Sequence, residues 1–109
     1  MTVLELEQKK IFEKAAGLNG GEQKISAVYC CDMLSVAMSH APAGCAWVTV
    51  VGNVNTLAAA VMAGAACVIL AEGIQMEPEV FQRAEEKGIF VFLSKLPVFE
   101  TALKIHKLL

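Results

Sequence analysis

Short apolar runs alternate with helical patterns along most of the chain. Residues 25–31, 47–51, 67–71 and 89–93 are continuous and apolar, as strands covered on both faces are. Residues 32–41, 56–63 and 78–88 lie between these runs and favour helices, and a further apolar helical pattern follows Ser94, its expected cap. Pro78 is suited to a first helical turn, and Gly88 to a helix end.

This alternation predicts an α/β fold, because parallel neighbouring strands need a helical crossover between them. We expect residues 1–109 to form one compact domain with a mostly parallel sheet of about four to five strands flanked by helices. Residues 3–10 favour a short helix with Thr2 as its N-cap, and residues 18–24 a loop. Residues 11–16 fit either a helix or a strand.

Composition and charge narrow the function classes. Of the 109 residues, 56% are hydrophobic, and the formal net charge is -2. Scattered charges of both signs give no reason to expect nucleic acid or an anionic membrane as a partner. The longest apolar stretch, residues 56–71, is too short to span a bilayer, and the charged N-terminus is unlike a secretory signal. We therefore expect a cytoplasmic protein.

The four cysteines predict thiols rather than a metal site. They form no C-x-x-C pair, and Cys30 and Cys31 would point to opposite faces of a strand. Cys30 and Cys67 both fall within predicted strands, where free cysteine acts as a small apolar residue. We expect four reduced thiols, no metal and no cofactor.

Polar residues follow the predicted strands and should meet at the carboxyl edge of the sheet, where open α/β sheets bind ligands. The candidate binding residues are Asp32, Gly52, Asn53, Asn55, Thr56, Glu72 and Gly73. For each polar residue taken alone, capping a helix is the more common role, and we expect it for Asp32. In the turn "GNVNT" we expect Asn55 or Thr56 to cap the helix, which would leave Asn53 free to contact a ligand. The two acids favour a ligand with hydrogen-bond donors, or a cation, over a bare phosphate.

No catalytic residue is predicted. The sequence has no evident carboxylate pair, no nucleophile beside a base and no phosphate-binding glycine loop. We therefore expect a non-enzymatic regulatory or interaction module that binds a small polar effector, nucleotide-like or anionic, at the carboxyl edge. The alternative is a small enzyme that handles phosphoryl or acyl groups, with its site completed across a dimer.

A homodimer is expected because the helix at residues 56–63 is apolar on nearly every side. Such a helix is usually buried on more than one face, and a domain of 109 residues has few layers with which to cover it. Small residues on this helix would let a partner helix approach closely: Ala58, Ala59, Ala60 and Ala63.

The segments "YCCDMLSVAMSHAPAGCAWVTVVGNVNTLAAAVMAGAACVILAEGI" and "EEKGIFVFLSKLPVFETALKI" together resemble the DRTGG-domain family. The resemblance covers almost the whole chain and is to short stand-alone members, although the five letters that name the family do not occur. It implies a compact α/β domain related to the non-catalytic N-terminal region of HPr kinase/phosphorylase. Similar domains accompany CBS domains in regulatory pyrophosphatases and occur in phosphotransacetylases, are accessory, and tend to pair. No catalytic residues carry over; the matching polar points are Asp32, Gly52, Asn53, Asn55 and Gly73.

Overall fold

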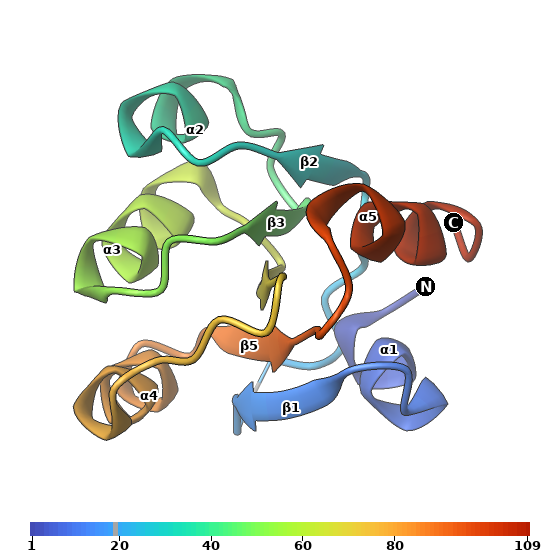
Figure 1. Cartoon of the computed structure of the whole chain (residues 1–109), viewed down its shortest axis with the longest axis horizontal. Coiled ribbons are helices and arrows are strands. Elements are labelled where there is room, and N and C mark those ends of the chain that lie inside the picture. The colour runs from blue at the N-terminus through green and yellow to red at the C-terminus, as the bar shows by residue number, and fades with distance from the viewer. Residues whose placement is uncertain (19) are drawn as a thin grey trace.

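The chain folds into three layers, with a five-stranded sheet between two layers of helices (Figure 1). The computed structural model describes residues 1–18 and 20–109, so Asn19 of the predicted loop lies outside the described residues. The helices are α1 (Val3–Lys9), α2 (Leu34–His40), α3 (Val54–Ala63), α4 (Pro78–Glu86) and α5 (Val98–His106). The strands are β1 (Glu13–Ala16), β2 (Val28–Cys30), β3 (Ala46–Thr49), β4 (Cys67–Leu70) and β5 (Phe90–Leu93).

The strand order is β1-β5-β4-β3-β2, and β2 to β5 are parallel neighbours in chain order. The predicted α/β class and the mostly parallel sheet are therefore confirmed. The alternative left open for residues 11–16 is also decided, because β1 runs antiparallel to β5 at the sheet edge, with Glu13 opposite Leu93.

Each face of the sheet has its own core. Because consecutive parallel strands are neighbours and their crossovers share one hand, α2, α3 and α4 all cover the same face. The helices α1 and α5 cover the other face (Figure 1). Within β3, the side chain of Trp47 packs in the first core and that of Val48 in the second, both fully buried. Trp47 also donates from its indole nitrogen to the Cys31 carbonyl oxygen at 2.9 Å, which fixes the chain where it leaves β2.

Thr2 caps α1 as predicted. Its hydroxyl accepts from the Glu5 backbone N–H at 3.1 Å, and the Glu5 carboxylate accepts from the Thr2 N–H at 2.8 Å. The hydrogen bond from the Thr2 backbone lowers the pKa of Glu5.

In contrast, the predicted starts of two later helices are wrong. Helix α3 begins at Val54 rather than at residue 56, and the N-cap of α5 is Pro97 rather than Ser94. The Ser94 hydroxyl instead lies 2.8 Å from that of Thr101 and accepts from the Leu96 N–H, so it shapes the turn before α5. Within the described part of the chain, no helix is both long and apolar enough to cross a membrane.

Candidate functional site

Asp32 joins the carboxyl ends of β2 and β3. One carboxylate oxygen accepts from the buried hydroxyl of Thr49 at 2.9 Å and from the backbone N–H of Val50 at 3.0 Å. The predicted capping role of Asp32 is wrong, because Met33 is the N-cap of α2 and makes no side-chain cap. Asp32 lies one residue before the N-cap position, and its carboxylate instead accepts hydrogen bonds from donors at the end of β3.

In the turn "GNVNT", the predicted division of roles is also wrong. Asn53 is the N-cap of α3, and its side-chain oxygen accepts from the N–H groups of Asn55 at 2.9 Å and Thr56 at 3.3 Å. The Thr56 hydroxyl is buried and donates back to the Val51 carbonyl. Asn55 is exposed and makes no capping bond. Asn53 therefore has the structural role that was expected of its neighbours.

Gly52 turns the chain between β3 and α3 in a tight space. A Cβ at this position would lie 3.1 Å from Leu70 Cδ1 and 3.2 Å from Met76 Cγ. Glycine is therefore favoured at this turn by close packing against the segment that follows β4, since Gly52 does not have a positive φ.

Glu72 and Gly73 both adopt left-handed backbone conformations, with φ of 64° and 71°. Their N–H groups donate to the carbonyl oxygens of Leu96 and Ser94 at 2.8 and 2.9 Å. These bonds tie the loop after β4 to the loop after β5. The predicted residues therefore form separate structural groups along one edge, with Asp32 at the end of β2 and Gly73 beside the end of β5.

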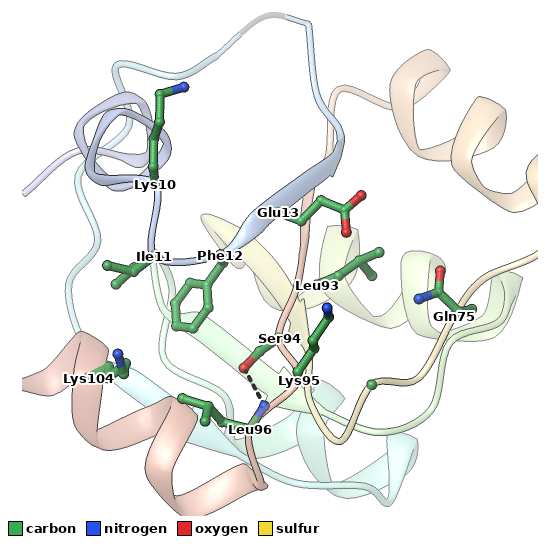
Figure 2. Close-up of a pocket in the computed structure, with 11 residues that line it drawn as sticks. Lys10, Ile11, Phe12, Glu13, Gln75, Leu93, Ser94, Lys95, Leu96 and Lys104 are labelled. Carbon is green, nitrogen blue, oxygen red and sulfur yellow. Dashed lines mark hydrogen bonds between the residues drawn. The ribbon is translucent and has the colours of Figure 1, made fainter.

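A cavity of about 470 Å³ opens at the carboxyl end of β5 (Figure 2). Its wall is built from residues 10–12 before β1, residues 94–96 after β5, the loop after β4 and Lys104 of α5. Gly73 is the member of the predicted set that lines this cavity. The antiparallel addition of β1 beside β5 brings residues 10–12 to this edge.

Three lysines line the cavity: Lys10, Lys95 and Lys104. Within residues 1–18 and 20–109, the ion pair that forms is between Lys14 and Glu7, so none of these three ammonium groups has a carboxylate partner. Glu13 is the acidic residue on the wall, and the amide of Gln75 adds both donors and an acceptor.

Sequence reasoning missed the three lysines. Lys95 comes two residues after the predicted strand at residues 89–93, so it could have been included among the residues of the carboxyl edge. Lys10 and Lys104 could not have been found by local pattern, because the pairing of β1 with β5 brings Lys10 to the cavity and the packing of α5 brings Lys104.

The four cysteines are free thiols, as predicted. Cys45 and Cys67 are buried, and burial raises the pKa of Cys45 to about 11 and also raises that of Cys67. Cys30 is exposed rather than buried, because β2 is a short edge strand. Its partial desolvation, and secondly the charge of Asp32, raise the pKa of the Cys30 thiol. Across the described residues, no group of three or more His, Cys, Asp or Glu side chains is arranged to hold a metal ion.

The fold and the cavity define an α/β domain with a ligand-sized hollow at the carboxyl edge of its sheet. The sequence model of the DRTGG domain matches residues 13–108. The chain therefore belongs to the DRTGG domain family, as the resemblance in the sequence indicated. A comparison with curated proteins gave no match.

Among solved structures, the chain is similar to the CBS and DRTGG domains of the regulatory region of Clostridium perfringens pyrophosphatase, determined with the activator diadenosine tetraphosphate. The TM-score is 0.69 at 15% sequence identity, so this likeness concerns the fold. The match covers 94% of this chain and 45% of that one. The chain thus spans less than half the length of that regulatory region.

Proposed function

We propose that this chain is a non-catalytic regulatory module that binds a small polar or anionic effector at the carboxyl edge of its sheet. The observation that carries the proposal is the cavity of about 470 Å³ at that edge, where open α/β sheets usually bind ligands. Membership of the DRTGG family supports it, since the similar pyrophosphatase region is regulatory and was determined with a nucleotide activator.

Three earlier expectations become parts of this proposal. Residues 1–109 act as one DRTGG-like domain, the domain forms a homodimer, and it works in the cytoplasm. Gly73 contributes to the effector cavity. The other predicted residues stay candidate contacts further along the same edge: Asp32, Gly52, Asn53, Asn55, Thr56 and Glu72.

The chemistry of the edge favours binding over turnover. The Asp32 carboxylate is occupied by Thr49 and Val50, and the Ser94 hydroxyl by Thr101 and Leu96. Neither group is held by a base as an activated nucleophile would be. The raised pKa values of Cys45 and Cys67 also keep these thiols protonated near neutral pH.

The test combines a binding map with a turnover assay. The ¹⁵N-labelled protein is titrated with ADP, AMP, pyrophosphate and acetyl phosphate, and amide shifts are recorded. We expect shifts at the carboxyl edge, at Gly52, Gly73 and Leu96, while ³¹P spectra show no conversion of any compound. Conversion faster than in buffer alone would favour the enzyme alternative. Shifts confined to the opposite edge of the sheet would contradict the proposed location.

A further inference from the structure

The cavity at the end of β5 concentrates positive charge on a protein that is negative as a whole. Lys10, Lys95 and Lys104 line it against the one carboxylate of Glu13, although the formal net charge of the chain is -2. The described residues provide no ion pair for any of these lysines, so their charges are available to a ligand. An anion entering here would replace the missing carboxylate partners.

The three lysines come from separate parts of the chain, and in Figure 2 the side chain of Lys10 extends away from Lys95 and Lys104. Lys10 ends α1 in a left-handed conformation with φ of 56°, Lys95 lies in the loop after β5, and Lys104 is in the last turn of α5. Charges placed around a hollow attract an anion more strongly than the same charges spread over a convex surface, because clefts with low-dielectric walls focus the field.

The remaining wall residues suit a ligand with more than an anionic group. Glu13 accepts hydrogen bonds, Gln75 both donates and accepts, and Phe12 and Leu93 provide apolar surface. A cavity of about 470 Å³ lies in the size range of small-molecule sites, roughly 300–1,000 Å³. It exceeds what a single inorganic anion needs.

We propose that this cavity binds a phosphate-bearing small molecule of nucleotide size. Lys95 and Lys104 hold its phosphate oxygens, and Glu13 and Gln75 accept hydrogen bonds from its hydroxyl or amino groups. The assignment rests on the proposed effector-binding function and adds the ligand class and the residues. It also replaces the expectation that the two predicted acids would repel a phosphate, because Asp32 and Glu72 are not part of the cavity wall.

The site would link the N-terminal segment to the family domain. Lys10 precedes the matched residues 13–108, whereas Lys95 and Lys104 lie within them. A ligand that fills the cavity contacts residues 10–12 as well as Lys95 and Lys104, so it joins the end of α1 to α5. Because a ligand that binds the folded state alone stabilises it by mass action, occupancy should raise the melting temperature and restrain residues 10–12.

The test compares two double variants that remove the same number of charges. Lys95→Gln with Lys104→Gln changes the cavity, and Lys24→Gln with Lys107→Gln changes exposed lysines away from it. ADP, pyrophosphate and adenosine are titrated at low salt by calorimetry and by ¹⁵N shifts, and thermal unfolding confirms that each variant folds. We expect ADP to bind the cavity variant about tenfold or more weakly than the wild type and the control. Binding should also weaken as salt rises, because salt screens the charges.

The ligand probes separate the sources of affinity. Pyrophosphate binding with no adenosine binding supports recognition through phosphate, and ADP binding more tightly than pyrophosphate supports the nucleotide-sized site. Equal ADP affinity for the two double variants overturns the lysine site. If the shifts then map to Gly52 and Asn53, the proposed effector-binding function survives without it. Adenosine binding as tightly as ADP, or no binding of any probe, overturns the phosphate assignment.

Discussion

The hydroxyl of Thr49 donates a hydrogen bond of 2.9 Å to the carboxylate of Asp32, across the carboxyl ends of β3 and β2. Thr49 is fully buried, and its oxygen also accepts from the Val51 N–H at 3.3 Å. The same Asp32 oxygen accepts from Val50 at 3.0 Å. The Asp32 carboxylate therefore links β2 to β3 and satisfies the buried Thr49 hydroxyl and the Val50 N–H at the start of the β3–α3 turn.

We predict that Asp32→Ala lowers the free energy of unfolding by about 1–3 kcal/mol, because it leaves the buried Thr49 hydroxyl without its acceptor. Asp32→Asn keeps a side-chain oxygen and should lose less. Glu86→Ala, at an exposed position of α4, should stay within about 0.5 kcal/mol of wild type. Urea denaturation followed by circular dichroism measures all three. Equal midpoints for Asp32→Ala and Glu86→Ala would show that the hydrogen bonds of the Asp32 carboxylate contribute no stability.

The second prediction concerns the cap of α3. Asn53→Ala should cost about 0.5–2 kcal/mol of stability, because two N–H groups of the first turn lose their acceptor. Asn53→Asp should retain most of it, since aspartate caps as well. Asn55→Ala is the matched control and should change stability by less than about 0.5 kcal/mol. The reverse ranking in urea denaturation would restore the capping role first expected of Asn55.

The sequence was sufficient for the parallel part of the fold. Its apolar runs at the positions of β3, β4 and β5 are long enough to mark strands, and Pro78 marks the start of α4. The capping error at α3 has a local cause. Asn53, Asn55 and Thr56 are all good caps, and the choice depends on where the chain turns at Gly52. That turn is set by packing against Leu70 and Met76, which are distant in sequence.

The sequence predicted which edge of the sheet carries the candidate site, but not which residues line it. Strand polarity alone placed it at the carboxyl ends of the strands. Which end of that edge is hollow depends on β1, whose antiparallel pairing with β5 is a non-local contact. No periodicity within residues 11–16 encodes that pairing, so Lys10 could not have been assigned to the cavity wall.

Glu72 should tolerate glycine unusually well. Its φ of 64° puts a side-chain-bearing residue in the left-handed region, which costs about 1–2 kcal/mol. Glycine relieves this cost, and the gain offsets its greater entropy loss on folding. Glu72→Gly should therefore leave the melting temperature unchanged or raise it, whereas Glu72→Val should lower it. The control Glu86→Gly, inside α4, should cost about 1 kcal/mol. A lower melting temperature for Glu72→Gly than for Glu86→Gly would contradict the prediction.

Thiol labelling should distinguish the exposed Cys30 from the buried Cys45 and Cys67. In the native protein at pH 8, iodoacetamide should modify Cys30 but not Cys45 or Cys67, because the latter two are buried and burial raises their pKa values. All four should react in urea. Since the charge of Asp32 helps to raise the pKa of Cys30, Asp32→Asn should increase its labelling rate at a fixed pH. Glu72→Gln, which removes a carboxylate elsewhere, should not. Mass spectrometry of peptides assigns the sites, and rapid native labelling of Cys67 would contradict the buried core.

Thiol burial also predicts the direction of a pH effect. Burial raises the pKa of folded Cys45 from 9.0 to about 11, so its stabilising contribution is complete below about pH 9 and is lost as the pH rises towards 11. Cys45→Ala should therefore lose less stability than wild type between pH 9 and pH 11. Urea midpoints at the two pH values measure the difference.

The proposed homodimer makes a prediction that distinguishes two exposed apolar surfaces. On α3, Ala59 and Ala60 are buried within their own chain. They therefore cannot contact a partner helix, contrary to the first expectation. The outer side of that helix instead exposes Val61 by 54% and Met62 by 69%, and α5 on the opposite face exposes Phe99 by 69%. If the dimer forms through α3, covering about 800 Å² per subunit, then Met62→Glu buries a charge in the interface while Phe99→Glu does not.

Sedimentation velocity at tens of micromolar measures the outcome. The wild type and Phe99→Glu should sediment as dimers of the 11.6 kDa chain, and Met62→Glu as a monomer with an unchanged melting curve at low concentration. A dimer lost in Phe99→Glu but kept in Met62→Glu would move the interface to the α5 face. A monomeric wild type would contradict the proposed homodimer. The expected pattern follows from burial, because a charge at Met62 is free of cost on a solvated helix and costly only where a second subunit excludes water.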